Sequence, residues 1–291
     1  MSNCNRIRIA LEEVSDEHIR GASWSMLHTI RGIIEEIETG TNICSCNDLP
    51  RKIIEANPTM TPLHWVAHVL EEACHEETKP ADIKDKLLSL LEYKRHAEES
   101  LNENIRNILL GKKTIMTFSY SSTIEQALLS LPHDMRPSII IPISLPGGEG
   151  LEMAKRLSKM GFHTQPIPDT LIHVKLEQSD LALIGADTIT LDGCLFNKVG
   201  TRLLALACRD TNIPLYSAFD ATKINPFRNC HEIPVLVRYS NLNGYRLSYP
   251  VFDNTPIEYL DKIITERGIL DANNDSLSLL YKELLEALSP P

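Results

Sequence analysis

An acid at the end of an apolar segment and an Asn-Lys pair ten residues later are the strongest candidates for chemistry. Asp187 ends Ile184-Gly-Ala-Asp, and Asn197-Lys198-Val-Gly200-Thr201 leads into an apolar segment with helical spacing. Glycine allows close backbone approach, and the N–H groups at a helix start favour negative charge. The pattern would place an acid beside an anionic ligand. A turn acid followed by an ordinary helix cap explains the same residues, and composition alone favours that simpler interpretation.

Two further loops carry polar residues or glycine. Thr117-Phe-Ser-Tyr-Ser-Ser-Thr123 could cradle a phosphate with hydroxyl and amide groups, or Ser121 or Ser122 could simply cap a helix. Pro146-Gly-Gly-Glu-Gly150 indicates a flexible loop before a helix. The chain has no G-x-S-x-G around these serines, no Walker loop and no G-x-G-x-x-G after a strand. The sequence therefore gives no support to a hydrolase elbow, a P-loop or dinucleotide binding.

Arg20-Gly21-Ala22 begins or interrupts the first predicted helix. Glycine inside a helix costs about 1 kcal/mol relative to alanine. Close approach by a ligand or a neighbouring chain would explain why a glycine stands at this position, as would a local irregularity of the helix.

Histidines and cysteines offer little evidence of a metal site. His64 and His68 are one helical turn apart, but no H-E-x-x-H is present, so we expect a surface pair. The seven cysteines are scattered, and a chain of 291 residues does not need disulfides, so we expect free thiols. Cys44-x-Cys46 lacks a second pair at zinc-site spacing. We expect no metal and no cofactor.

The elements that must position these residues divide the chain at about residue 110. Before it, apolar steps of three and four predict helices over 15–38, from Thr61-Pro62 onward, and over 81–110, the last as a connecting helix. After it, strands are expected at 114–117, 138–143, 181–185 and 215–218. Helices are expected at 123–131, 151–160, 201–209 and 257–266. We predict a helical domain, 1–110, and a Rossmann-like α/β domain, 111–291, whose parallel sheet has helices on both faces. Ligands bind such sheets beyond the carboxyl ends of the strands.

Composition excludes several classes of protein. With 43% hydrophobic and 23% charged residues the chain is globular rather than disordered. A formal net charge of −10 disfavours direct nucleic-acid binding, but leaves room for a local basic pocket. No apolar stretch has the length of a signal peptide core or a membrane span, so we expect a cytoplasmic protein with no membrane contact.

The order of four segments resembles one family. TIMTFSYSSTIEQAL, LALIGADTITLDGCLFNKVGT, IPLYSAFDATKI and FDNTPIEYLDKIITERG follow one another as in the alpha, beta and delta subunits of initiation factor 2B and their archaeal homologues. Ribose-1,5-bisphosphate isomerase and methylthioribose-1-phosphate isomerase share this order. The similarity runs from about residue 19 to about residue 270 and is most specific in the C-terminal half. It implies a helical N-terminal domain, a Rossmann-like C-terminal domain, and a homo-oligomer that is at least a dimer.

The resemblance also implies a site. Asp187 matches the catalytic aspartate of the isomerases, and Ser119 stands at the position of their catalytic cysteine. The matched ligand-binding positions are Arg20, Gly21, Ala22, Asn197, Lys198, Asp220 and Lys223.

Three departures separate this chain from the isomerases. Besides Ser119 in place of the cysteine, the family acid and arginine before the Gly-containing helix start correspond to Ile143 and Leu145. A serine hydroxyl without a base partner is poorly ionised at neutral pH, where a thiol ionises far more readily. A lost arginine removes a charged hydrogen bond worth roughly 1.5–3 kcal/mol.

We therefore expect a binding or regulatory protein similar to initiation factor 2B, with a pocket for a small phosphorylated ligand, a sugar phosphate or a nucleotide. Initiation factor 2 or related subunits are candidate partners. The alternative is an aldose–ketose isomerase of altered specificity that acts on a sugar phosphate through Asp187. A purely structural oligomerisation module is a third interpretation, which the shared pocket residues disfavour.

Overall fold

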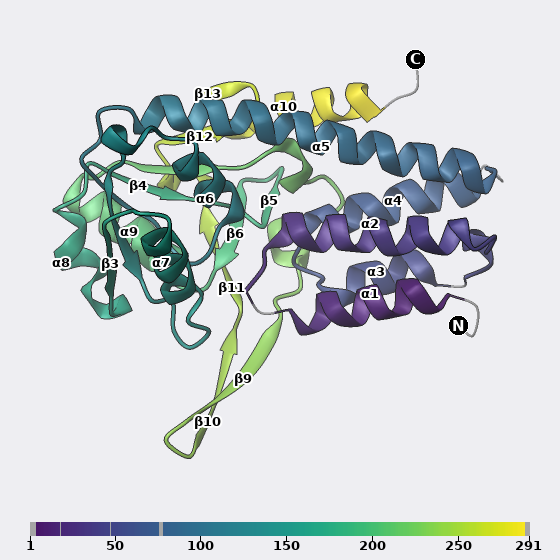
Figure 1. The fold of residues 1–291 in the computed structure, drawn as a ribbon, viewed down its shortest axis with the longest axis horizontal. Coiled ribbons are helices and arrows are strands. Elements are labelled where there is room, and N and C mark those ends of the chain that lie inside the picture. The colour runs from purple at the N-terminus through teal and green to yellow at the C-terminus, as the bar shows by residue number, and fades with distance from the viewer. Residues whose placement is uncertain (1–3, 18, 47, 76–77, 289–291) are drawn as a thin grey trace.

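The first part of the chain is helical. The computed structural model describes residues 4–17, 19–46, 48–75 and 78–288. Four helices pack together at one end of the molecule (Figure 1): α1 (Asn5–Asp16), α2 (Ala22–Glu38), α3 (Leu49–Ala56) and α4 (Thr61–His75). Trp65 of α4 is buried and donates its indole N–H to the carbonyl of Ile224 at 3.1 Å, which ties this helix to the second part of the chain.

One long helix, α5 (Pro80–Leu109), runs along both parts of the molecule (Figure 1). Its first half buries Ile83, Leu87 and Leu90 in the core shared with α2 and α4. Its second half buries Leu101 and Ile105 in a second core against the sheet. The predicted connecting helix is thus present. Because α5 contributes to both cores, the packing does not by itself separate two domains, and a domain boundary at 110/111 is a proposal.

A seven-stranded, mostly parallel sheet dominates the second part, as the sequence predicts. Its order is β13-β12-β7-β4-β1-β2-β3, and only the β12–β13 pair is antiparallel. The strands are β1 (Thr114–Met116), β2 (Ser138–Pro142), β3 (Thr164–Ile167), β4 (Leu181–Ile184), β7 (Leu215–Ala218), β12 (Lys262–Thr265) and β13 (Gly268–Asp271).

Helices cover both faces of this sheet. The second core contains Ile139 and Ile141, whereas Ile140, which points to the other face, belongs to the first core. Residues of α6 (Ser122–Leu129) and α7 (Glu149–Lys159) join the second core; those of α8 (Ile172–Leu176) and α9 (Thr201–Thr211) join the first. Burial on both faces explains why these strands are continuous apolar runs in the sequence.

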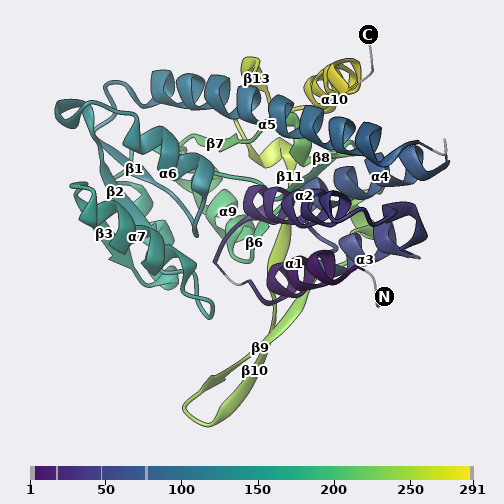
Figure 2. The same cartoon turned by 45° about the vertical axis from the view of Figure 1, so that its right-hand side comes forward.

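A smaller sheet and a hairpin were not predicted. The sheet has the order β11-β6-β5-β8 and consists of β5 (Thr188–Thr190), β6 (Cys194–Lys198), β8 (Ile224–Asn225) and β11 (Phe252–Pro256). The antiparallel hairpin β9 (Val237–Leu242) and β10 (Tyr245–Pro250) projects from the body in both views (Figures 1 and 2). The C-terminal helix α10 (Asn274–Leu288) lies beside α5 (Figure 2).

Two predicted helices are wrong in detail. The helix expected at 257–266 is instead a single 3-10 turn, Ile257–Tyr259, followed by strand β12. Its apolar residues fit helical steps, but Ile263-Ile264-Thr265 is β-branched and completes the sheet beside β7. The helix expected at 15–38 begins later than predicted, as α2 at Ala22, and residues 15 and 16 are instead the end of a separate helix, α1.

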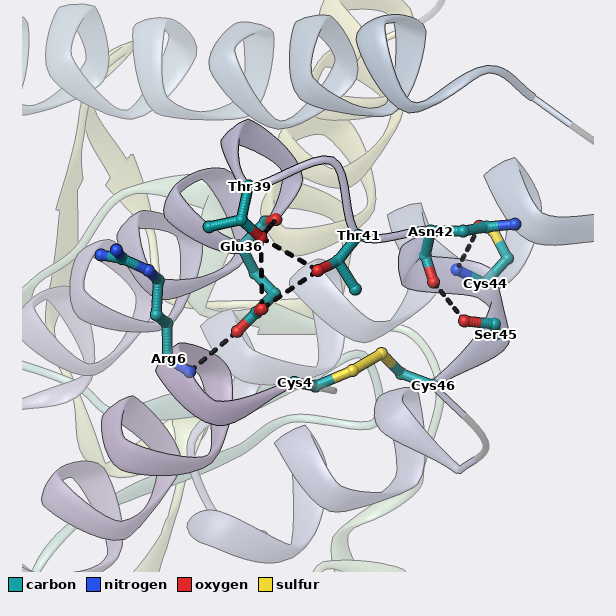
Figure 3. Close-up of a disulfide and its surroundings, with 9 residues drawn as sticks. All are labelled: Cys4, Arg6, Glu36, Thr39, Thr41, Asn42, Cys44, Ser45 and Cys46. Atoms are coloured by element: carbon teal, nitrogen blue, oxygen red, sulfur yellow. Dashed lines mark hydrogen bonds between the residues drawn. A yellow bond between two sulfur atoms is a disulfide. The ribbon is translucent and has the colours of Figure 1, made fainter. Parts of the chain in front are cut away.

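The expectation of free thiols is also wrong. Six cysteines form three disulfides, Cys4–Cys46, Cys44–Cys74 and Cys194–Cys230, and the buried Cys208 is free. Figure 3 shows the first of them beside Glu36, which accepts a hydrogen bond from the amide of Arg6 at 2.8 Å. The partners are 30 to 42 residues apart, so their proximity depends on the folded chain and cannot be deduced from sequence alone.

His64 corrects a further expectation. Its ring is buried, and Nε2 donates to the carbonyl of Pro58 at 3.0 Å, so it is not half of a surface pair with His68.

No helix in the described residues is long and apolar enough to cross a membrane.

Candidate functional site

A polar pocket lies between the start of α2 and the ends of strands β4 and β6. It brings together residues that are more than 200 positions apart in the sequence, from the helical part, the sheet and the hairpin. The lining residues are Glu17, Ile19, Arg20, Gly21, Asn57, Met60, Ser119, Tyr120, Glu149, Asp187, Asn197, Lys198, Arg238, Val251 and Phe252.

Asp187 follows strand β4 and lies at the junction of the two parts of the chain. Its Oδ1 accepts a hydrogen bond from the amide of Ala22, the first residue of α2, at 3.3 Å. Burial raises the pKa of Asp187; the charges of Lys223 and Lys198 and the Ala22 hydrogen bond oppose that shift. Burial thus favours the neutral form of this carboxyl group, and the neighbouring lysines favour the charged form.

Lys198 and Asn197 end strand β6 rather than starting a helix as expected. The Nζ of Lys198 lies 2.6 Å from Oε1 of Glu149, and both side chains are buried. Asn197 donates its side-chain amide to Oγ1 of Thr201 at 3.1 Å. The lysine charge is thus already paired inside the protein.

Ser119 also lines the pocket. It has a left-handed backbone with φ of 63°, and its amide donates to Oγ of Ser144 at 3.1 Å. The nearby Ser121 caps helix α6, because its hydroxyl accepts from the amide of Ile124. The simpler interpretation of the serine-rich loop therefore holds for Ser121.

Arg20 lies at the mouth of the pocket. Its side chain is 57% exposed and is 3.6 Å from Glu17, and its guanidinium lies 4.8 Å from the Trp24 ring centre. An exposed cation at the mouth of a polar cavity can attract an anion. Gly21 is the N-cap residue of α2, which explains why it does not weaken that helix from within.

Asp220 and Lys223 are not among the residues that line this pocket. Both are buried behind it, and Asp220 forms an ion pair with Lys94 of helix α5. Burial lowers the pKa of Lys223 to about 8, with the nearby Lys94 charge adding to the shift. Lys223 acts on the pocket through its charge, since it opposes the rise in the pKa of Asp187.

Sequence reasoning missed Glu149 and Arg238. Arg238 belongs to the hairpin and donates to the carbonyl of Glu17 at 2.7 Å, and burial lowers its pKa. Glu149 was visible only as part of a glycine-rich loop. An acid among three glycines at a helix start was the available signal, but nothing local indicated that its side chain turns inward.

The two aliphatic positions in the family motif lie apart from this lining. Leu145 is 59% exposed, and its amide donates to Asp169 at 2.7 Å. Neither Ile143 nor Leu145 is a lining residue of the pocket.

A wider groove continues outward from the pocket. It shares Arg20 and Tyr120 with the pocket and extends to Trp24 and Arg156. Glu125 holds this end in place, because it accepts hydrogen bonds from Tyr120 at 2.8 Å and from Arg156 at 2.6 Å.

Among the described residues, no group of three or more His, Cys, Asp or Glu side chains is arranged to hold a metal ion.

Comparison with known proteins identifies the family. Residues 18–272 match the initiation factor 2 subunit family. The chain is 30% identical over 271 residues to a putative translation initiation factor eIF-2B subunit 2-like protein of Pyrococcus abyssi, covering 91% of this chain and 96% of that protein. It is 25% identical over 228 residues to ribose 1,5-bisphosphate isomerase of Methanocaldococcus jannaschii, covering 75% of this chain and 74% of that enzyme.

A solved structure agrees with this assignment. The crystal structure of translation initiation factor eIF-2B from Pyrococcus horikoshii has a TM-score of 0.86 and 27% sequence identity, and the match covers 93% of this chain and 98% of that chain. The chain therefore belongs to the initiation factor 2 subunit family, as its ordered motifs predict. Both eIF-2B-like proteins and isomerases are among its relatives.

Proposed function

We propose that this protein is a binding or regulatory member of the family that holds a small phosphorylated ligand in the pocket at Asp187 and does not catalyse the family isomerase reaction. The observation that carries this proposal is the combination at one site of Ser119 at the cysteine position with Lys198 already paired to Glu149. A serine there lacks the ionisable thiol, and a paired lysine is less available to neutralise a reacting anion.

Arg20 and Arg238 supply the positive charge for the phosphate. Guanidinium groups bind phosphate oxygens through two parallel hydrogen bonds. Arg20 is exposed, and Arg238 of the hairpin is partly buried and also lines the pocket. The adjoining groove with Trp24 gives room for a nucleotide as well as a sugar phosphate.

A thermal-shift screen of phosphorylated sugars and nucleotides, with turnover measured in parallel, tests the proposal. We expect a higher unfolding temperature with at least one compound and no product formation. Arg20→Gln should weaken that shift, whereas Arg8→Gln, an exposed arginine of α1 paired with Glu12, should not. Robust isomerisation by the unmodified protein would overturn the proposal.

The second candidate is an isomerase of altered specificity. The position of Asp187 in the pocket and the upward shift of its pKa by burial favour it, because a raised pKa brings a carboxyl group closer to the range useful for general acid–base catalysis. In that case Asp187→Asn should abolish turnover while ligand binding persists. The turnover assay of the screen decides between the two candidates.

We also propose that the chain forms at least a homodimer through its C-terminal half, and that initiation factor 2 or related subunits are candidate partners. Helix α9 presents Leu203 and Leu206 at 66% and 46% exposure. Arg202 and Arg209 of the same helix lie over the ring of Tyr259 in the FDNTPIEY segment. Exposed leucines at this density are typical of a contact surface. Native mass spectrometry at micromolar concentration should detect a dimer, and Leu203→Asp should weaken it; a monomeric wild-type protein would contradict the proposal.

A further inference from the structure

A second cavity lies in the helical part of the chain, beside the connection that follows the end of α2. Its volume is about 310 Å³, which is enough room for a small molecule. Three of the residues that line it are half-cystines, Cys44, Cys46 and Cys74, and all three are partly exposed. They belong to two different disulfides, so two sulfur–sulfur bonds border one cavity.

The cysteines on the α2–α3 connection are held in place by a hydrogen-bonded turn. The amide of Cys44 donates to Oδ1 of Asn42 at 3.1 Å, and the hydroxyl of Ser45 donates to the carbonyl of Asn42 at 2.6 Å (Figure 3). Cys74, the partner of Cys44, lies in the last turn of α4. The Cys44–Cys74 bond therefore joins two ordered elements at the cavity wall.

Access distinguishes the two disulfides. Both half-cystines of Cys44–Cys74 line the cavity, whereas Cys4 of the other disulfide is only 5% exposed and is not a lining residue. Thiol–disulfide exchange requires a thiolate to reach one sulfur of the bond, so its rate depends on access. A small molecule in the cavity therefore meets the Cys44–Cys74 bond more readily than the Cys4–Cys46 bond.

The charges of the wall select among small molecules. The acids Asp48 and Glu71 line the cavity together with the basic His75, and Asp48 is also paired with Arg51 at 3.2 Å. Glu71 is exposed and stands three residues before Cys74 on α4. Acidic side chains attract cations and repel anions over a Debye length of about 8–10 Å at physiological salt. A thiol that carries a positive charge is thus favoured over one that carries a carboxylate.

We propose that this cavity is a site of reversible disulfide exchange at Cys44–Cys74, and that its reactant is a small thiol with a positively charged group. The thiolate of the reactant attacks one sulfur of the bond, for example that of Cys74, and forms a new sulfur–sulfur bond with it. The Cys44–Cys74 bond breaks, and Cys44 leaves as a thiolate that takes up a proton from water.

One disulfide replaces another in this step, so it needs no separate oxidant or reductant. The product carries the small thiol as a mixed disulfide on one cysteine and a free thiol on the other. It also releases the covalent tie between α4 and the α2–α3 connection. The modification is independent of ligand binding at Asp187, which lies at the other end of α2.

The test treats the full chain with excess cysteamine and traps the released thiols with iodoacetamide at a series of times. Peptide mapping by mass spectrometry then locates the adduct. We expect cysteamine on Cys74 or Cys44, with the other of the two alkylated. The Cys194–Cys230 disulfide lies outside the cavity and is the reference within the same molecule. Cys44–Cys74 should open at least about tenfold faster than this reference.

A second measurement tests the charge preference with mercaptoacetate, a thiol of similar size that carries a carboxylate. The ratio of the cysteamine rate to the mercaptoacetate rate is compared between variants, so that the intrinsic reactivity of each thiol cancels. Glu71→Gln should lower this ratio by about twofold, because it removes an acid from the wall. Glu72→Gln, the next residue of α4 and not a lining residue, is the matched control and should change the ratio less.

Each outcome decides a part of the proposal. Faster opening of Cys194–Cys230, equal opening of the two bonds, or absence of the Cys44–Cys74 bond before treatment overturns the exchange site. An unchanged ratio in Glu71→Gln, with a circular dichroism spectrum like that of the wild-type protein, overturns the preference for cationic thiols. None of these results depends on whether the pocket at Asp187 binds a phosphorylated ligand.

Discussion

The Nζ of Lys94 lies 2.5 Å from Oδ2 of Asp220, and both side chains are almost fully buried. Lys94 is on the long helix α5, and Asp220 is the second residue after strand β7. This ion pair therefore joins the helix to the sheet. Glu98 adds a second carboxylate 2.8 Å from the same ammonium group.

Lys94→Met should lower the free energy of unfolding by about 3–5 kcal/mol, because it leaves a buried charge on Asp220 without its main partner. Urea denaturation measures this loss. Lys84→Met is the matched control: Lys84 is paired with Glu38 at 2.6 Å on the surface, and its loss should cost less than about 1 kcal/mol. Combining Lys94→Met with Asp220→Asn should cost less than the sum of the single variants; strict additivity would contradict the coupling.

His64 should make the protein sensitive to mild acid. Burial lowers the pKa of His64 from 6.5 to about 4, so between these values the unfolded chain binds a proton that the folded protein does not. Stability is therefore fully present above pH 6.5 and is lost as the pH falls toward 4, by up to about 3 kcal/mol.

Chemical denaturation at a series of pH values measures this dependence. His64→Gln, which can still donate to Pro58, should flatten the curve between pH 4 and 6.5. His68→Gln, one turn along the same helix and partly exposed, should leave the slope as it is. If both variants kept the wild-type slope, His64 would not be the responsible group.

Reduction should destabilise the protein. Each disulfide closes a loop of 30 to 42 residues, and loops of this length are worth about 2–4 kcal/mol. A lower thermal midpoint in dithiothreitol is expected. Thiol titration under denaturing conditions should detect one free cysteine, Cys208, before reduction and seven after it; seven before reduction would show that the bonds are absent.

The wild-type protein should not measurably isomerise ribose-1,5-bisphosphate or methylthioribose-1-phosphate. Proton transfer by a positioned group contributes about 10²–10⁴-fold, and Ser119 stands where the thiol would act. Ser119→Cys alone should not restore activity, because the acid and the arginine of the family motif are still missing at Ile143 and Leu145. Turnover is expected first in the triple variant with Ile143→Glu and Leu145→Arg, as measured by NMR of the product; activity in Ser119→Cys alone would contradict this reasoning.

Local patterns in the sequence determined much of the architecture. Helical spacing predicted α4 and α5, and apolar runs predicted β1, β2, β4 and β7, because these signals depend on near neighbours in the chain. The ordered motifs also selected Arg20, Asp187, Asn197 and Lys198, which lie along one pocket. Their roles in ligand binding stay predictions.

Only the tertiary structure decided the features that depend on distant residues. Ile263-Ile264 became a strand because β7 offered an open edge, and six cysteines paired because folding brought them together. The inward turn of Glu149 onto Lys198 spans 49 residues, and the pairing of Lys94 with Asp220 spans 126. No local pattern encodes such contacts, since burial and partner geometry arise only when separate segments pack against one another.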